Sequence, residues 1–441
     1  MTNVADATPV SARAQPPGRP SIRGLVAQTE IDLRLFGMLV ALAAILLGFN
    51  ILSGGKFFQP TNMVTLAVQA SGVAVIATGM VLVIVSRNID LSVGSLVGLI
   101  AMTYALLMTD WLPNLLGMGV DYPFRWLIAL GLGIALGAAM GALQGFIIAY
   151  VGVPSFIVTL GGLLSIRGLV WYLSSGAAVS GLDPTFQLIG GGAQGSIGGT
   201  LTWGLGLVGC LAIVWLLISG RRQRRRFDFP VRPMWAEVLI GTVGCVVMIG
   251  LAAFANANLW PEGLANRIAI EQHWGPAPAD GWRISTGLPY PIILLLGVAL
   301  VMTFMAIRRR FGRYVYAYGG NPDAADLAGI NTRWTILKTY VVMGVLCALA
   351  AAIAAARLNG ATLDIGQSYE LYVIAAAVVG GTSFAGGIGT IPGAVLGAFV
   401  MQSLAYGLSF MGVNSPGQNV AAGIVLILAV GFDTYTRRRG S

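Results

Sequence analysis

The stretch Trp126–Ala149 reads WLIALGLGIALGAAMGALQGFIIA and contains no charged side chain. A helix needs about 20 predominantly apolar residues to cross the hydrocarbon core of a bilayer, and this run meets that length. Gly133, Gly137, Gly141 and Gly145 recur at every fourth position, which leaves one helix face open to close approach by a second helix. The stretch therefore predicts a membrane helix that packs tightly against a neighbour.

Apolar runs of similar length continue on both sides of this stretch. Hydrophobic residues make up 56% of the 441 residues and charged residues 10%, with a mean hydropathy of +0.80. The runs are continuous and lack the alternating polarity of a membrane β-barrel, so helices that satisfy their own backbone hydrogen bonds are expected. The sequence predicts an all-α, polytopic membrane helical bundle with spans near residues 35–52, 63–86, 91–109, 126–149, 155–173, 202–219, 235–256, 290–307, 335–356, 369–382, 391–410 and 419–435.

Residues 201–288 are predicted to be an added unit. They contain two spans joined by the basic loop Arg221–Arg232, followed by the loop Asn256–Pro289, which is rich in Trp, Pro and Ala. Without this unit ten spans remain, and each crosses the membrane in the same direction as before. We therefore expect ten core helices with a two-helix insertion, within one membrane domain over residues 35–435.

The positive charges predict the orientation of the spans. With the N-terminus inside, 20 of the 26 Lys and Arg residues fall in inside segments, as is usual for cytoplasmic loops. Both termini are expected in the cytoplasm, residues 1–34 as a disordered tail and residues 436–441 as a short one. The same rule explains the run Arg221–Arg226 as a topology anchor, so no nucleic-acid partner is expected despite the net charge of +9.

The chain has few residues suited to catalysis or to ATP or metal binding. His273 is the only histidine, and the three cysteines lie inside apolar runs. Neither Lys56 nor Lys338 stands in the Gly-Lys-Ser/Thr order of a phosphate-binding loop. We expect no catalytic residues, no metal and no cofactor, and the chain is predicted not to be an enzyme.

Two similar units predict an internal repeat, as transporters often carry. In each, an apolar run (Met63–Ser86 or Tyr369–Val379) leads into a polar, Gly-, Ser- or Thr-containing break and then into another apolar run. The second run is short for a full crossing. Its break therefore either lies within the membrane beside a watery cavity or is a plain turn. The residues of the two breaks that we predict to line or gate a translocation pathway are Asn88, Asp90, Ser92, Thr382, Ser383, Gly386 and Gly387.

Ionisable residues at or within the spans are candidates for function because they are costly in lipid. Asp90 either caps the following helix or lines the pathway, and these roles do not exclude each other. Arg167, also predicted as a pathway residue, either ties its helix to a neighbouring carbonyl or carboxylate or contacts the transported molecule. Apart from these and Glu370 the spans have few such groups, which favours a neutral substrate and an external source of energy.

The inside loop after the eighth span contains a predicted short helix. Asn321 precedes Pro322 and Asp323, which is a typical helix start, and Gly329 is a typical stop. This helix either docks onto another protein or is a plain surface helix.

Five motifs together resemble the permease subunits of bacterial sugar ABC importers of the ribose/xylose type. The motifs occur in the order of that family and are Asn88–Ser95, Pro154–Gly161 with Arg167-Gly168, Phe311–Asn321, Ala324-Ala325 with Gly329-Ile330, and Gly380–Gly387. The resemblance implies a pathway for a neutral monosaccharide in the bacterial inner membrane. It also implies four kinds of partner: a cytoplasmic ATPase subunit, a periplasmic sugar-binding protein, a second permease copy and membrane lipid.

The 201–288 insertion is most similar to the D-xylose type of this family. Members usually have a Gly pair where this chain has Arg87-Asn88. An ion-coupled secondary carrier and a passive channel are the alternatives. By resemblance, the residues that couple to the ATPase are Asn321, Asp323, Ala324, Ala325, Asp326, Gly329 and Ile330, with Ala324 and Ala325 expected to form a flat exposed surface.

Overall fold

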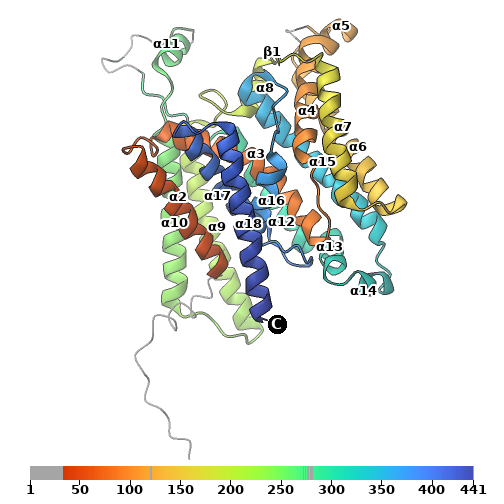
Figure 1. Cartoon of the computed structure of the whole chain (residues 1–441). Helices are drawn as coiled ribbons and strands as arrows, with labels where there is room; N and C mark the ends of the chain where they lie inside the picture. The colour runs from red at the N-terminus through yellow and green to blue at the C-terminus, as the bar shows by residue number, and fades with distance from the viewer. Residues whose placement is uncertain are drawn as a thin grey trace, which may run out of the picture.

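The computed structural model describes residues 33–119, 122–271 and 282–440, together with residues 273, 275 and 278, and it is almost entirely helical (Figure 1). All but the last two residues of the predicted 1–34 tail lie outside this part of the chain. The elements in order are α2 (Leu33–Leu52), α3 (Pro60–Val85), α4 (Val93–Leu106) with the π-helix η1 (Leu107–Trp111) and α5 (Leu112–Leu116), α6 (Arg125–Phe146) with the π-helix η2 (Ile147–Val151), α7 (Ser155–Ser174), β1 (Val179–Ser180), α8 (Pro184–Gln187), the 3-10 helix η3 (Leu188–Gly190), α9 (Gly198–Arg226), α10 (Met234–Asn256), α11 (Glu262–Glu271), α12 (Tyr290–Arg308), α13 (Arg310–Gly320), α14 (Pro322–Leu327), α15 (Thr332–Leu358), β2 (Gly360–Ala361), α16 (Tyr369–Val379), α17 (Ile391–Phe410) and α18 (Ser415–Gly440).

The predicted fold class is confirmed. Among the described residues, ten helical stretches are long and apolar enough to cross a membrane, and two shorter apolar ones lie at Tyr369–Val379 and Ser415–Leu428. Each of the twelve predicted runs corresponds to one of these twelve stretches. Helix α18 continues to Gly440, so residues 436–440 of the predicted C-terminal tail are helical.

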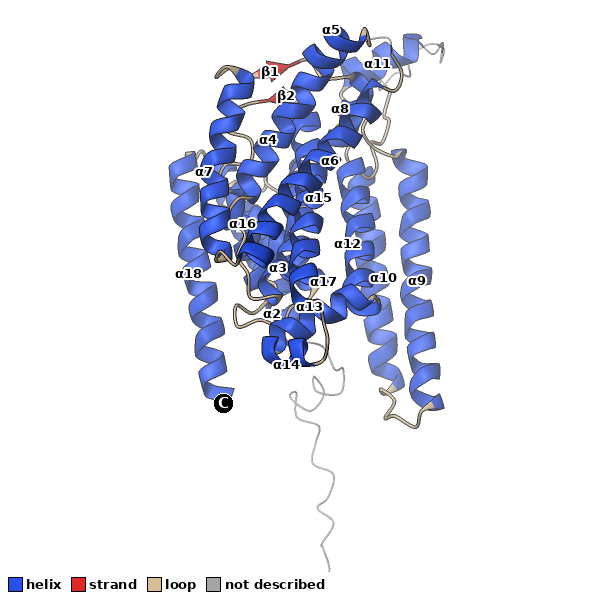
Figure 2. Cartoon of the chain, turned by 90° about the vertical axis from the view of Figure 1, so that its right-hand side faces the viewer, coloured by secondary structure: helices blue, strands red, loops and turns tan. Residues whose placement is uncertain are grey.

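The bundle has two ends, which Figure 2 separates clearly. We call the end that carries α13, α14 and the C-terminus the α14 end. The opposite end carries α5, α8 and the strands β1 and β2, and we call it the sheet end. The strands pair antiparallel, Val179 opposite Ala361, and so join the segments that follow α7 and α15.

Helices α3, α4 and α15 form the centre of the bundle. The apolar stretches of α3 and α4 are buried along nearly their whole length, whereas α2, α9 and α10 keep most side chains exposed. Exposed apolar side chains on the outer helices suit a surface surrounded by lipid. Helices α9 and α10, in the region predicted as an insertion, pack against each other at one edge of the bundle (Figure 2).

Glycines let α6 and α15 approach closely, as the four-residue spacing predicts. A Cβ at Gly137 would overlap the carbonyl of Gly344, and a Cβ at Gly344 would overlap the carbonyl of Gly137. One turn further along α6, a Cβ at Gly141 would overlap the carbonyl of Tyr340. Backbones meet directly at these points, because glycine has no side chain to hold them apart.

Helix α16 is too short to cross a membrane alone. Its 11 residues rise about 16 Å, roughly half of a hydrocarbon core. The chain reaches α16 from β2 through the non-helical segment 362–368, which lies against α4. A Cβ at Gly98 of α4 would lie 2.8 Å from the carbonyl oxygen of Ile365. The crossing is therefore a broken one.

Candidate functional site

Most of the first predicted break, between α3 and α4, is buried inside the protein, although Arg87 is exposed. Asn88, Asp90 and Ser92 are each less than 10% exposed. The Oδ1 atom of Asp90 accepts hydrogen bonds from the backbone N–H of Ser92 at 2.9 Å and from its hydroxyl at 2.7 Å. Because Ser92 is the N-cap residue of α4, the carboxylate of Asp90 closes the turn that leads into this helix.

Polar side chains from three other helices hold the same break. Gln144 of α6 and the hydroxyl of Ser92 are hydrogen-bonded at 2.9 Å. The carbonyl oxygen of Ile89 accepts hydrogen bonds from Tyr340 of α15 at 3.2 Å and from Thr159 of α7 at 3.3 Å. The sequence analysis missed these partners, although Gln144 and Thr159 are polar residues in otherwise apolar runs.

Arg167 ties α7 to the segment that precedes α16. Its Nη1 donates to the carbonyl oxygens of Leu363 at 2.9 Å and Ile365 at 3.2 Å. Of the two roles considered for Arg167, the structure shows the tie to neighbouring carbonyls. Nearby, Oε2 of Glu370 is buried without a hydrogen-bond partner among the described residues, and a Cβ at Gly94 of α4 would overlap it.

The second predicted break, Gly380–Gly389 between α16 and α17, is buried over residues 380–383 and partly exposed beyond them. Thr382 and Ser383 are fully buried. The backbone of Ser383 donates to the carbonyl of Ile388 at 2.9 Å, and its hydroxyl accepts from the N–H of Ala385 at 3.1 Å. The hydroxyl of Thr382 has no partner among the described residues. Irregular backbone is tolerated inside a membrane protein when protein surrounds it, which is the arrangement of the buried parts of both breaks here.

The structure brings the two breaks together with the end of α13. The N–H of Gly387 donates to the carbonyl of Val85, the last residue of α3, at 3.0 Å. The side chain of Arg87 donates from Nε to the carbonyl of Gly319 at 2.7 Å and from Nη2 to that of Gly320 at 2.9 Å. We call this meeting point the junction; its members are Val85, Arg87, Gly319, Gly320, Gly386 and Gly387.

The junction needs glycine for close approach and for backbone conformation. A Cβ at Gly319 would overlap the carbonyl of Val85. Gly386 and Gly387 have φ values of 85° and 73°, in the left-handed region that glycine adopts without steric cost. Arg87 lies in the same region with φ of 59°. The family that the sequence resembles usually has glycine at this position. Arg87 and Asp90 are both at the first break, but they bond to different partners.

Helix α14 begins and ends as the sequence predicts. Oδ1 of Asn321 accepts a hydrogen bond from the N–H of Ala324 at 3.0 Å, Pro322 is the first helical residue, and Gly329 follows the helix with φ of 76°. A carboxylate oxygen of Asp326 accepts from the hydroxyl of Thr332, which fixes α14 against the start of α15. Only one residue separates α14 from the junction, because α13 ends at Gly320.

The expected flat surface of Ala324 and Ala325 is wrong for Ala325. Ala324 is exposed, but Ala325 is only 4% exposed and packs inside the chain itself. On a single turn of helix these two neighbours point in different directions, so they cannot share one surface. The most exposed large apolar side chain of α14 is Leu327, at 90%.

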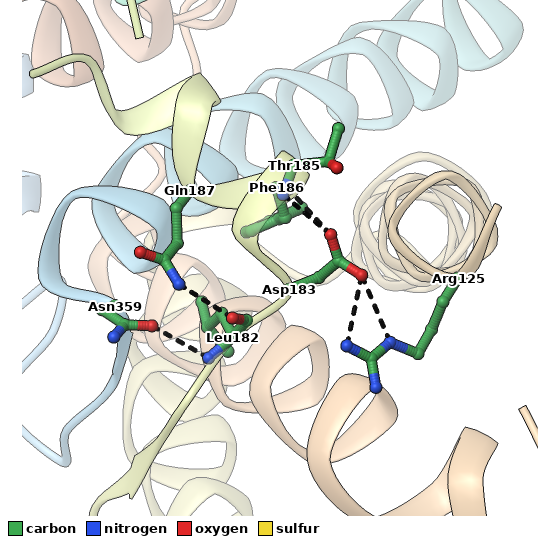
Figure 3. A network of polar contacts seen from close by, with 7 residues as sticks. All are labelled: Arg125, Leu182, Asp183, Thr185, Phe186, Gln187 and Asn359. Atoms are coloured by element: carbon green, nitrogen blue, oxygen red, sulfur yellow. Dashed lines mark hydrogen bonds and ion pairs between the residues drawn. The ribbon is translucent and has the colours of Figure 1, made fainter. Parts of the chain in front are cut away.

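A buried polar network lies at the sheet end, and Figure 3 shows it. Arg125, the first residue of α6, forms an ion pair with Asp183 at 3.2 Å, with both side chains below 10% exposed. The other carboxylate oxygen of Asp183 accepts from the backbone N–H of Thr185 at 2.9 Å and so caps α8. The Oδ1 atom of Asn359, just after α15, accepts from the N–H of Leu182 at 2.9 Å. The network ties the sheet ends of α6, α8 and α15 together. The sequence analysis did not single out Arg125 or Asp183, although Asp183-Pro184 is a helix start signal.

Two cavities open near the sheet end, and none of the predicted pathway residues lines either of them. The first, about 430 Å³, lies at the start of α9 and is lined by Trp260, Thr200, Ser285 and Thr286 among others. The second, about 370 Å³, is mostly apolar and includes Trp126 and Tyr290. In the part of the chain that the structure describes, no group of three or more His, Cys, Asp and Glu could hold a metal ion.

Comparison with known proteins identifies one family. The family model described as "Branched-chain amino acid transport system / permease component" matches residues 62–221 and 229–430. The xylose transport system permease protein XylH of Haemophilus influenzae is 34% identical over 410 residues, which cover 93% of this chain and 98% of that protein. XylH of Escherichia coli K12 is 35% identical over 420 residues, covering 95% and 96%. The galactose/methyl galactoside import permease protein MglC of the same strain is 28% identical over 414 residues, covering 91% and 96%. No solved structure matches the chain.

Proposed function

The chain belongs to the branched-chain amino acid transport system / permease component family, and on that premise we propose that it forms the membrane pathway of an ATP-driven importer of D-xylose or a related pentose. The permease assignment made from the sequence motifs is confirmed by the family match and the relatives. The observation that carries the choice of sugar is the 34–35% identity to two xylose permeases over nearly the whole chain, against 28% for a galactoside permease.

The charges near the two breaks favour a neutral sugar over an amino acid. An amino acid carries an ammonium and a carboxylate, and both would need a counter-charge in a low-dielectric pathway. Three of the charged groups there already have partners: Asp90 accepts from Ser92, Arg167 donates to two carbonyls, and Arg87 donates to two others. Glu370, whose Oε2 has no hydrogen-bond partner among the described residues, is a single carboxylate and cannot balance both charges of an amino acid. A monosaccharide needs only hydrogen bonds, which Asn88, Ser92, Thr382 and Ser383 supply.

In this proposal the two breaks form the gate of the pathway. Their polar side chains are buried in this conformation, so the gate is closed at the junction. Opening requires α3, α4, α16 and α17 to separate where they change direction, and the glycines at the junction supply backbone freedom there. The unpartnered hydroxyl of Thr382 is a group that gains a hydrogen bond when the gate opens to water or sugar.

The α14 end is the proposed docking surface for a cytoplasmic ATPase subunit. Leu327 projects from a short capped helix one residue away from the junction, so a partner that binds α14 also touches the gate. The coupling residues are those carried over from the family motif, with Leu327 in place of Ala325 as the outward apolar contact. At the opposite end, a periplasmic sugar-binding protein delivers the substrate, and a second copy of the chain completes the permease.

The orientation follows from the same assignment. Both termini and the loop Arg221–Arg232 lie in the cytoplasm, Asn256–Pro289 lies in the periplasm, and the chain spans the bacterial inner membrane. Single-cysteine labelling in intact cells tests this after the three native cysteines are replaced. An impermeant reagent should label a cysteine in the loop Asn256–Pro289 but not Arg224→Cys. Labelling of Arg224→Cys from outside would show that the proposed topology is wrong.

Transport in proteoliposomes tests the function. With a xylose-binding protein outside and an ATPase subunit on the permease, D-xylose uptake should require ATP, and leucine should not compete. Xylose uptake by the permease alone under a proton gradient would identify an ion-coupled carrier. Leak without any gradient or ATP would identify a channel. Either result would refute the proposal.

A further inference from the structure

Arg87 combines an unfavourable backbone conformation with a well-bonded side chain. Its φ of 59° places a residue with a full side chain in the left-handed region, which is sterically costly for all residues except glycine. Such conformations persist only where the surroundings fix them, and they concentrate at switch regions. Here the C-terminal cap of α3 fixes the backbone of Arg87, since the N–H of Asn88 donates to the carbonyl of Val83 at 3.0 Å, and two other elements of the chain hold its side chain.

The first of these elements is the end of α13. The guanidinium of Arg87 spans the carbonyls of Gly319 and Gly320, the last two residues of that helix. Carbonyls at a helix C-terminus lack intrahelical partners and carry partial negative charge, so a cation that donates two hydrogen bonds satisfies both needs. A lysine has the charge but not the fork of donors that fits two neighbouring oxygens.

The second element is the break between α16 and α17. A Cβ at Gly386 would lie 2.5 Å from Cγ of Arg87 and 2.5 Å from the carbonyl oxygen of Gly319. Cγ of Arg87 and the end of α13 thus both lie against Gly386, although Arg87 as a whole is exposed. A second bond joins the same two elements, since the hydroxyl of Tyr316 on α13 donates to the carbonyl of Gly389 at 2.7 Å.

We propose that Arg87 is a positioning residue that latches α13 to both breaks, so that a displacement of α14 moves the two halves of the gate together. The proposal rests on the proposed function, because it assigns the route by which docking at α14 reaches the gate. The hydrogen bond of Tyr316 connects α13 to the second break but not to the first. Arg87 is the residue whose side chain joins the first break to α13, beside the backbone hydrogen bond between Val85 and Gly387 that joins the two breaks.

Arg87→Gly removes the proposed latch without disturbing the fold. Glycine adopts the left-handed conformation without steric cost, so the substitution removes the two side-chain hydrogen bonds while relieving the backbone. We expect the variant to reach the membrane, to bind the ATPase as the wild type does, and to unfold at no lower temperature. Sugar transported per ATP hydrolysed should fall by about tenfold or more, because two hydrogen bonds from a charged group are lost. Arg87→Lys should restore part of this loss.

A distance measurement reports on the latch directly. In a chain without native cysteines, spin labels at Ala328→Cys and Leu91→Cys occupy an exposed position at the end of α14 and a half-buried position on the first break. Their separation should stay constant between ATP-bound and nucleotide-free complexes in the Arg87 protein and should change in the Arg87→Gly protein. A purely structural role for Arg87 would alter stability without producing this nucleotide-dependent difference.

The matched control is Asp228→Gly, which changes another left-handed residue, φ of 53°, in the exposed loop between α9 and α10. It should leave the ratio of transport to hydrolysis unchanged. Normal coupling and an unchanged label separation in Arg87→Gly would overturn the latch. Absence of ATP-dependent uptake in the unmodified complex would instead overturn the proposed function, so the two failures are distinguishable.

Discussion

Replacing Leu327 by alanine should weaken the complex between this permease and its ATPase. Leu327 is the most exposed large apolar side chain of the described residues, at 90%, and it lies on the α14 end. Docking that buries it stabilises the complex by roughly 0.8 kcal/mol for each CH₂ group, so the change from Leu to Ala costs about 2 kcal/mol. That energy corresponds to a roughly thirtyfold higher Kd.

The assay is a titration of the purified ATPase subunit onto the permease in lipid nanodiscs. Ile270→Ala is the matched control, because Ile270 is 77% exposed in α11, outside the α14 end. Leu327→Asp adds a charge at the same position and should weaken binding further, since a carboxylate buried without a partner is costly. Neither change at Leu327 should lower the unfolding temperature, because the side chain makes little contact within the chain. Unchanged Kd values for both Leu327 variants would refute docking through α14.

Three further predictions follow from the packing. Gly386→Val should abolish sugar uptake while the complex still assembles, because a side chain at this position collides with the junction. Uptake at the normal rate would show that this break is an ordinary turn. Gly344→Ala should destabilise the permease by about 1–3 kcal/mol in thermal unfolding, because the added methyl group forces α6 and α15 apart. Gly131→Ala should not, because the space around Gly131 is open. Equal unfolding temperatures of the two variants would contradict the close contact between α6 and α15. Asp183→Ala should lower the free energy of unfolding by about 3–5 kcal/mol, because it leaves the buried Arg125 cation without its partner. An unchanged unfolding temperature would mean that the pair is exposed to water.

A control for the valine substitution is available at Gly412. Its φ of 81° matches the left-handed conformation of Gly386, but no atom lies within 4 Å of the position that a Cβ would take. Gly412→Val therefore introduces the backbone strain without the collision. Loss of uptake in both variants would show that strain in any turn stops transport and that the junction is not special.

The sequence alone determined the membrane helices and the local shape of α14. Both depend on residues that are close along the chain: an apolar run of sufficient length forms a helix in lipid, and Asn321, Pro322 and Gly329 define a helix start and stop within nine residues. The glycines spaced four apart on α6 also predicted a close seam. They did not identify the partner, which is α15, about 200 residues further along the chain.

The tertiary structure decided how the predicted pathway residues are arranged and what they touch. Arg87 bonds to Gly319 across more than 200 residues of chain, and Ala325 is buried although its neighbour Ala324 is exposed. Asp183 finds Arg125 because α8 returns to the start of α6. Local patterns specify the conformation of a segment and which of its faces is apolar. They do not specify which distant backbone carbonyl a guanidinium will meet, because that contact depends on how all the helices pack together.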